Sequence, residues 1–163
     1  MIRTRSSPIV VGLISDTHGL VRPRVAEVFS GVHMILHAGD VGGPSVLAAL
    51  SEIAPVEAVY GNVDDPHDPS LTRERVVTIA GITIHVSHGH EFGSPTAALA
   101  LARYAGDVVV FGHSHRPIVA RDSTGRMAIN PGAAGPRRFD LRPSVAILTI
   151  ADGAIEAAII SLE

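Results

Sequence analysis

Cysteine and tryptophan are absent from this 163-residue chain, and aromatic residues make up only 4% of it. Without cysteine the chain forms no disulfide bond and no thiolate metal site, so any bound metal must have nitrogen and oxygen ligands. Few aromatic rings are available to stack on nucleotide bases, and a formal net charge of −3 argues against a basic face for phosphate backbones. We therefore do not expect a nucleic-acid partner.

Long hydrophobic runs are also absent. No apolar segment approaches the roughly 20 residues that a membrane-spanning helix needs. Arg3 and Arg5 resemble the start of a secretion signal, but the apolar run Ile9–Ile14 is too short for such a signal and meets the charged Asp16. We interpret residues 1–7 as a flexible lead-in and expect a cytoplasmic protein without membrane contact. The length fits a single domain, residues 1–163, that buries about 70% of its unfolded surface.

Short runs of β-branched residues alternate with Ala- and Leu-rich segments in the first half of the chain. The strands predicted there are Ile9–Ile14, Met34–Leu36 and Val56–Tyr60, and the predicted helices are Arg22–Ser30 and Pro44–Ile53. This β-α-β-α-β order predicts parallel strands joined by right-handed crossovers.

The second half is dominated by short strands separated by turns. The predicted strands are Arg75–Ile79, Ile82–Ser87, Val108–Phe111, Ile118–Arg121, Met127–Ile129, Ser144–Ile150 and Ile155–Ile160, and the predicted helix is Pro95–Tyr104. The turn Ala80-Gly81 joins the first two strands as an antiparallel hairpin. Together the two halves predict an α/β fold, a four-layer α/β/β/α sandwich of two mixed sheets.

Polar side chains follow five of the predicted strands, each time at the point where the strand ends. They are Asp16 and His18, Asp40, Asn62 and Asp64, His88 and His90, and His113 and His115. Ligand sites in α/β sheets form outside the carboxyl ends of the strands. Asp, Asn and His are also common in turns that merely cap strands, but five strand ends with the same residue types favour one shared site.

These side chains are suited to binding metal. Carboxylate and amide oxygens combined with neutral imidazole nitrogens favour Mn, Zn, Fe or Ni over Ca or Mg alone. Asp40 is the best candidate to bridge two ions, because a carboxylate has two oxygens to share. Two metals about 3.5–4 Å apart can hold a hydroxide and clamp a phosphoryl oxygen, so that no side-chain nucleophile is needed.

The motifs Asp-x-His, Gly-Asp, Gly-Asn, His-Gly and Gly-His-Ser-His, in this order, resemble those of the calcineurin-like metallophosphoesterase superfamily. The compact chain and its Gly-Asn-Val-Asp motif are similar to the small bacterial and archaeal phosphodiesterase branch, which includes the retromer subunit of eukaryotes. The resemblance implies two divalent metal ions, with Mn preferred and Ni, Zn, Fe or Mg as alternatives. It places one ion on Asp16, His18 and His115, the other on Asn62, His88 and His113, and Asp40 between them.

The chain departs from its relatives at two motif positions. Ala133 replaces the serine of the branch's Asn-Pro-Gly-Ser loop, so no hydroxyl is available there. Many larger relatives have a histidine directly after the motif asparagine, where it can protonate the leaving group. This chain has Val63 followed by Asp64, so a histidine at that position is not the general acid.

Other polar residues have both a functional and a structural interpretation. Asp64 could orient a histidine or donate a proton, or it could only form a turn. His90 could contact substrate or be an exposed turn residue, and Arg137 or its neighbour Arg138 could bind a phosphate oxygen or face solvent. His37 could orient a ligand or be a hydrogen-bonded core residue.

Two functions are consistent with these motifs. The first is a two-metal phosphoesterase, a phosphodiesterase rather than a phosphomonoesterase, that hydrolyses a small phosphodiester by attack of a metal-bridging hydroxide. Its expected catalytic residues are Asp40, Asn62, Asp64 and His90, and its expected substrate-binding residues are Asn62, His90 and Arg137. The alternative is a catalytically weak metal-binding scaffold for protein partners, like the retromer relative. Because the apolar C-terminal strand could lie at a sheet edge, a homo-oligomer is also conceivable.

Overall fold

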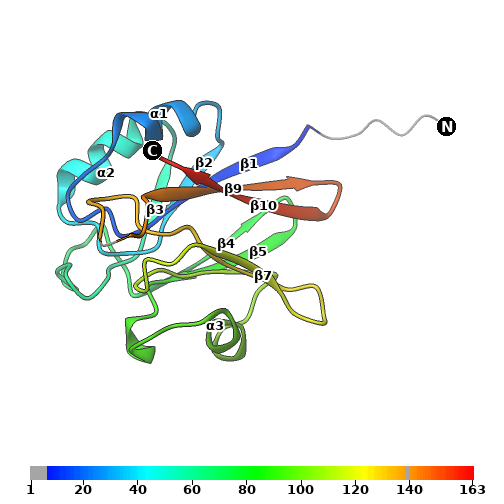
Figure 1. Ribbon diagram of the computed structural model, residues 1–163. Helices are drawn as coiled ribbons and strands as arrows, with labels where there is room; N and C mark the ends of the chain where they lie inside the picture. Colours follow the sequence, from blue (N-terminus) through cyan, green and yellow to red (C-terminus); the bar gives the residue numbers. More distant parts are fainter. Residues whose placement is uncertain (1–6, 139) are drawn as a thin grey trace.

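Two five-stranded mixed sheets form the framework of the computed structural model, which describes residues 7–138 and 140–163 (Figure 1). The expected lead-in lies almost entirely outside these described residues. The first sheet has the order β10-β9-β1-β2-β3, and the second has the order β4-β5-β6-β8-β7. In the first sheet β1, β2 and β3 pair in parallel and β9 and β10 pair antiparallel, whereas in the second sheet the two central pairs are parallel and the two outer pairs are antiparallel.

The first sheet contains the predicted β-α-β-α-β unit and the C-terminal hairpin. Its elements are β1 (Ile9–Ile14), α1 (Pro23–Val28), β2 (Met34–His37), α2 (Pro44–Ser51), β3 (Val56–Ala58), β9 (Ser144–Ala151) and β10 (Ala154–Ser161). β1 pairs in parallel with β2 and antiparallel with β9, so the beginning and the end of the chain meet in the middle of this sheet. β10 lies at one edge.

The second sheet is formed by the middle of the chain. Its elements are β4 (Glu74–Ile79), β5 (Ile82–Ser87), the short 3-10 helix η1 (His90–Phe92), α3 (Ala97–Arg103), β6 (Val108–Val110), β7 (Ile118–Arg121) and β8 (Met127–Asn130). β4 and β5 form the predicted antiparallel hairpin, and β5, β6 and β8 pair in parallel. The 3-10 helix has no counterpart among the predicted elements.

Three apolar layers hold the sandwich together. The central layer lies between the two sheets and contains Leu13, Leu36, Val86, Val110 and Leu148, which are all fully or almost fully buried. A second layer lies between the first sheet and helices α1 and α2, and a third between the second sheet and α3. The predicted four-layer α/β/β/α sandwich is therefore confirmed.

Several elements are shorter than predicted, for local reasons. The helix α1 ends at Val28 instead of Ser30, because the backbone tightens into three-residue turns there. The helix α3 begins at Ala97 because the Thr96 side chain accepts the N–H of Leu99 and caps it. The strand β3 ends at Ala58, and beyond it Val59 N–H still donates to His37 O of β2 while Tyr60 N–H donates to Thr72 O in the segment before β4.

Candidate metal centre

Seven predicted ligands lie together where strands of the two sheets end. The first sheet places Asp16, His18, Asp40 and Asn62 there, and the second places His88, His113 and His115. Ligand atoms of Asp16, His18 and His115 all lie within 4.8 Å of one another, and so do those of Asp40, His88 and His113. These are two groups of possible metal ligands, each drawn from both sheets.

Asp40 lies between the two groups. Its Oδ2 is 3.3 Å from His88 Nε2 in one group and 3.8 Å from His18 Nε2 in the other. Its Oδ1 accepts the N–H of Val63, which fixes the orientation of the carboxylate. This position is the one expected for a bridging carboxylate.

Asn62 completes the second group. Its Oδ1 lies 3.1 Å from His88 Nε2 and 3.1 Å from His113 Nδ1. The other ring nitrogen of His88 lies 2.8 Å from the backbone carbonyl of Ala38 and must donate to it. The neutral ring therefore presents the lone pair of Nε2 towards Asn62 and Asp40, as a metal ligand requires, whereas the protonated ring donates from Nε2 to Asp40.

Five of the seven ligands have a left-handed backbone. Their φ angles are 53° at Asp16, 46° at His18, 54° at Asp40, 69° at His113 and 61° at His115. Outside this cluster, the described non-glycine residues with positive φ are Ala80 and Asp152, which lie in hairpin turns. Such conformations cost of order 1–3 kcal/mol each and tend to gather at functional sites.

Close backbone contacts hold the ligand loops in place. The loop after β1 runs beside the loop after β2, because the N–H groups of Asp16, His18 and Gly19 donate to carbonyls of residues 39–41 at 2.9–3.0 Å. Gly61 and Gly112 leave no room for a side chain. A Cβ at Gly61 would lie 2.1 Å from Asp40 Oδ1, and one at Gly112 would lie 2.2 Å from Ser15 Oγ.

Asp64 holds two of the ligand loops together through backbone hydrogen bonds. Its carboxylate accepts the backbone N–H groups of Val41, Gly42 and Gly61 at 2.9–3.0 Å. It therefore connects the loop that presents Asp40 with the loop that presents Asn62. The turn interpretation of Asp64 describes its bond to Gly61, no histidine is among the hydrogen-bond partners of the carboxylate in the described structure, and few lone pairs are left with which to contact a substrate.

His37 is completely buried and joins the loop after β1 to the loop after β2 that presents Asp40. Gly39 N–H donates to its Nδ1 at 3.1 Å, so its Nε2 carries the proton and donates to Thr17 Oγ1 at 3.0 Å. Thr17 in turn donates to Val41 O at 2.7 Å. His37 is thus both a hydrogen-bonded core residue and a residue that positions the Asp40 loop.

The charges of the cluster are strongly coupled. Burial would raise the pKa of Asp40, but the hydrogen bond and charge of His88, together with the Val63 N–H, lower it to about 2. Burial also opposes ionisation of Asp16, where His115, His88 and Ser15 hold the pKa below its usual value. Burial would lower the pKa of His88, but Asp40 and Asp16 raise it. The carboxylates are therefore anionic, and a cation at their centre would displace protons from the histidines.

The donor set fits divalent metal ions. Asp16 Oδ1 and His18 Nε2 are buried and have no hydrogen-bond partner in the described structure. Around them, carboxylate oxygens, an amide oxygen and imidazole nitrogens lie close together. There are too few hydrogen-bond donors among them to pair all of these acceptor atoms. Buried unpaired acceptors are costly unless a cation neutralises them, and nitrogen with oxygen ligands suits Mn, Fe, Ni or Zn.

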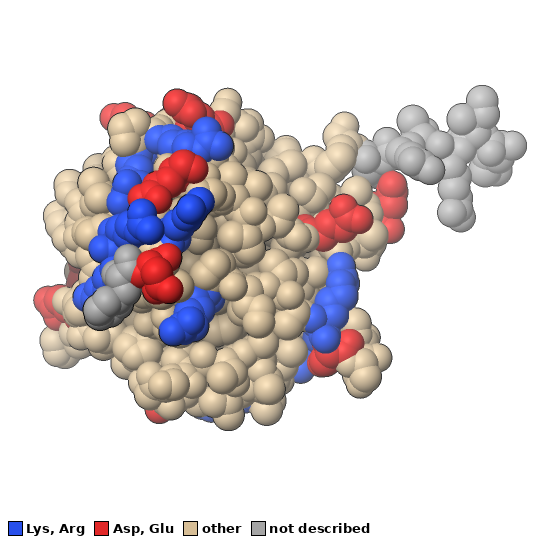
Figure 2. Space-filling model, in the orientation of Figure 1, with Lys and Arg blue, Asp and Glu red and all other residues tan. Residues whose placement is uncertain are grey.

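The remaining predicted site residues lie in different places. His90 is half-buried beside the cluster, with its ring centre 5.4 Å from that of His88, and its buried Nδ1 has no partner among the described residues. The Arg137 guanidinium lies 3.3 Å from Glu163 at the C-terminus, so it is not brought to the cluster and its substrate role stays a prediction. Figure 2 shows arginines and acidic side chains interspersed on one face of the molecule.

Two supporting residues were not singled out in the sequence. Ser15 Oγ donates to Asp16 Oδ2 at 2.6 Å, and the Asn130 side-chain amide donates to Gly112 O and Ser114 Oγ. Ser15 directly precedes a ligand, so its position was a usable signal. Asn130 ends β8, and only its proximity to the loop of residues 112–115 shows its role.

Comparisons with known proteins agree with this geometry. Residues 9–153 match the calcineurin-like phosphoesterase superfamily domain. The chain is 34% identical to a probable metallophosphoesterase of Methanothermobacter thermautotrophicus, with 93% of this chain and 92% of that protein covered. It is also 34% identical to phosphodiesterase YfcE of Escherichia coli K12, with 73% and 76% covered.

The fold also matches a solved structure. Vacuolar protein sorting 29 from Cryptosporidium parvum superposes with a TM-score of 0.78 at 21% identity, over 97% of this chain and all of that one. At this identity the likeness concerns the fold alone. The match over most of the chain and the identities with the two curated relatives show that this protein belongs to the calcineurin-like phosphoesterase superfamily.

Proposed function

We propose that this metallophosphoesterase is a two-metal phosphodiesterase that hydrolyses a small phosphodiester. The observation that supports the proposal most directly is the convergence of seven nitrogen and oxygen ligands into two groups that share the Asp40 carboxylate. Two divalent ions bound there, with Mn as the preferred metal, would supply a hydroxide nucleophile at neutral pH and neutralise charge on the phosphoryl group.

The chain's own residues would have separate tasks in this reaction. Asp16, His18 and His115 would hold one ion, and Asn62, His88 and His113 the other. Asp64 and His37 would keep the Asp40 loop in position through their backbone hydrogen bonds.

His90 is the best-placed residue for contact with the substrate. Its ring lies beside His88 and His113, with ring centres 5.4 and 6.4 Å away, and because its Nδ1 is buried, Nε2 is the nitrogen left to bond a phosphoryl or leaving-group oxygen. Burial and the charge of His88 lower its pKa, so it is neutral at pH 7 and can donate from one ring nitrogen.

A metal-binding scaffold for protein partners is the second candidate function. It is favoured by the shared fold with vacuolar protein sorting 29. A homo-oligomer would use the exposed edge of β10. The complete ligand set, which a scaffold does not require, is the feature that makes us prefer the enzyme.

The test is hydrolysis of bis(p-nitrophenyl) phosphate and of p-nitrophenyl phosphate by metal-stripped protein, with Mn, Ni, Zn or Mg added back. We expect metal-dependent cleavage of the diester in preference to the monoester. Asp40→Asn should lower the rate by at least about 100-fold, since it alters a ligand shared by both ions.

The matched control is Asp152→Asn, because Asp152 lies in the β9–β10 turn and asparagine tolerates its left-handed backbone. This control should keep the wild-type rate. Absence of turnover with every metal, in protein whose circular dichroism shows that it is folded, would contradict the enzyme proposal and favour the scaffold.

A further inference from the structure

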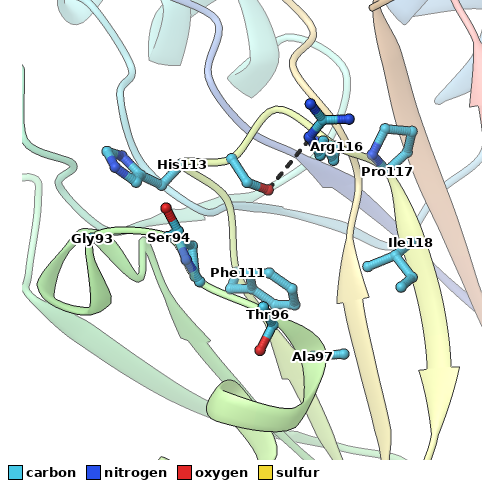
Figure 3. Close-up of a pocket in the computed structure, with 11 residues that line it drawn as sticks. Gly93, Ser94, Thr96, Ala97, Phe111, His113, Arg116, Pro117 and Ile118 are labelled. Atoms are coloured by element: carbon cyan, nitrogen blue, oxygen red, sulfur yellow. Dashed lines mark hydrogen bonds between the residues drawn. The ribbon is translucent and has the colours of Figure 1, made fainter.

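A cavity of about 560 Å³ opens directly beside the candidate metal centre (Figure 3). His113, a member of the second ligand group, forms one side of it. The segment of residues 93–97 before and at the start of α3 forms another side, and the chain from Arg116 to Ile118 lies across from His113. A group attached to a phosphate at the metal centre would therefore extend into this cavity.

The lining of the cavity is mainly apolar. Phe111 forms its floor, and Pro95, Pro117 and Ile118 contribute to its walls. Ile118 is 42% exposed, which leaves its apolar surface available to a ligand. Ligand pockets of about 300–1,000 Å³ with apolar walls and a few polar groups accommodate ring-sized organic groups.

Arg116 is the only arginine among the described residues that line this cavity. Its side chain is exposed, and none of the described carboxylates pairs with it. By contrast, Arg24, Arg75 and Arg137 all lie within 4.0 Å of a glutamate. A guanidinium without an acidic neighbour at the rim of an apolar cavity is suited to binding an anion.

We propose that this cavity binds the organic group of the phosphodiester and that Arg116 binds a second anionic group on it, which makes a phosphorylated nucleoside ester a fitting substrate. The proposal rests on the proposed phosphodiesterase function and adds its substrate class. A ring would pack against Pro117 and Ile118, the exposed apolar residues of the lining, while a second phosphate would receive hydrogen bonds from the Arg116 guanidinium. Arg116 and Ile118 would thus determine specificity and take no part in bond breaking.

The first experiment compares two substrates that differ only in the second anion. They are the p-nitrophenyl esters of thymidine 5'-phosphate without and with a 3'-phosphate. For the wild type we expect kcat/KM to be about fivefold higher with the 3'-phosphate, as for a solvent-accessible ion pair with bidentate geometry. Arg116→Gln should reduce this preference to about one, and the control Arg103→Gln, on the solvent side of α3, should retain it.

The second experiment tests the apolar wall with a pair of neighbouring residues. Ile118 lines the cavity, whereas Val119, the next residue of β7, is not part of the lining and points to the other face of the strand. Ile118→Asp should raise KM for both thymidine esters about tenfold with little change in kcat, because it removes binding shared by ground and transition states. Val119→Asp should leave KM unchanged.

Binding measurements separate this proposal from the proposed function. Calorimetric titration of the Mn-loaded proteins with thymidine 5'-phosphate and thymidine 3',5'-bisphosphate needs no turnover. Arg116-dependent preference for the bisphosphate without hydrolysis of any ester would support the cavity and contradict the phosphodiesterase. Hydrolysis with the same preference in wild type and Arg116→Gln, or equal effects of Ile118→Asp and Val119→Asp, would overturn the cavity proposal and leave the phosphodiesterase standing.

Discussion

At the scale of single residues, the candidate site depends on side chains and backbones held in costly states. Asp16, Asp40 and the histidines on either side of Ser114 have left-handed backbones that non-glycine residues seldom adopt. These conformations persist because neighbouring groups specify them, as when Asp64 accepts three N–H groups around the Asp40 loop. The strain directs several ligand side chains towards one point.

His37 gives a pH-dependent test of this arrangement. Complete burial lowers its pKa from 6.5 to about 4, against the attraction of Asp16 and Asp64, so the folded protein keeps it neutral. The unfolded chain binds a proton between pH 6.5 and 4 that the folded chain does not, so the free energy of unfolding falls as the pH falls through this window. We expect the wild type to lose about 3 kcal/mol there through His37.

Urea unfolding of metal-free wild type and His37→Gln at pH 7, 5.5 and 4 checks this prediction. Glutamine has no proton to gain, so the stability gap between the two proteins should shrink as the pH falls. His88, whose pKa is raised, is present in both proteins and cancels in the difference. A stability gap that stays constant across the three pH values would refute the role assigned to His37.

At the scale of elements, the site is built by loops that follow parallel strands and pack against each other without intervening side chains. Gly61, after β3, lies so close to Asp40 that an added Cβ would be 2.4 Å from the Asp40 backbone nitrogen. A Cβ added at Gly39 would similarly lie 2.7 Å from His88 Nδ1. The strands carry the ligands to the sheet edge, and the glycines let the loops approach closely enough to share ions.

Gly61→Ala should therefore lower both stability and metal affinity. We expect a loss of about 1–3 kcal/mol in the free energy of unfolding, the usual cost of overpacking. Mn affinity, measured by calorimetry, should fall at least about tenfold, because the Asp40 carboxylate must move. Gly125→Ala is the control, since its Cβ would meet no atom within 4 Å. That change should cost only backbone strain, and an equal loss of Mn affinity in both variants would contradict the explanation.

At the scale of the whole molecule, the candidate centre connects the two sheets. Each group of ligands draws on both, and His113 N–H donates to Asp16 Oδ2 across the gap at 3.2 Å. No helix among the described residues is long and apolar enough to cross a membrane. Bound ions would therefore add a further connection between the two sheets, beside the apolar layer and the hydrogen bonds that already join them.

Metal should stabilise the fold by an amount that rises with the logarithm of its concentration above the Kd. At a Mn concentration about 100 times the Kd, the gain is about 2.7 kcal/mol. For a chain of this length that corresponds to a rise in Tm of roughly 5–10 °C. Thermal melts of chelator-treated wild type and Asp40→Asn, with increasing Mn, measure the effect. A Tm that does not change in the wild type, or that rises equally in the variant, would be evidence against the assigned ligands.

The sequence by itself determined the elements and the residue types of the site, because both depend on local patterns. Apolar runs such as Ile9–Ile14 predict buried strands, and the polar residues directly after them must lie at strand ends. The layered fold and the superfamily followed from these patterns and are confirmed. The elements differ from prediction mainly at their ends, where single hydrogen bonds such as that of Tyr60 decide.

Only the tertiary structure decided how these parts act together. The order β4-β5-β6-β8-β7, the three N–H groups on Asp64 and the cavity between His113 and Ile118 all depend on contacts between residues far apart in the chain. Arg116 looks like any other arginine in the sequence, and Arg137 looked like the better anion ligand. Which of them has an acidic neighbour was settled by packing, because the partner Glu163 of Arg137 is 26 residues away along the chain.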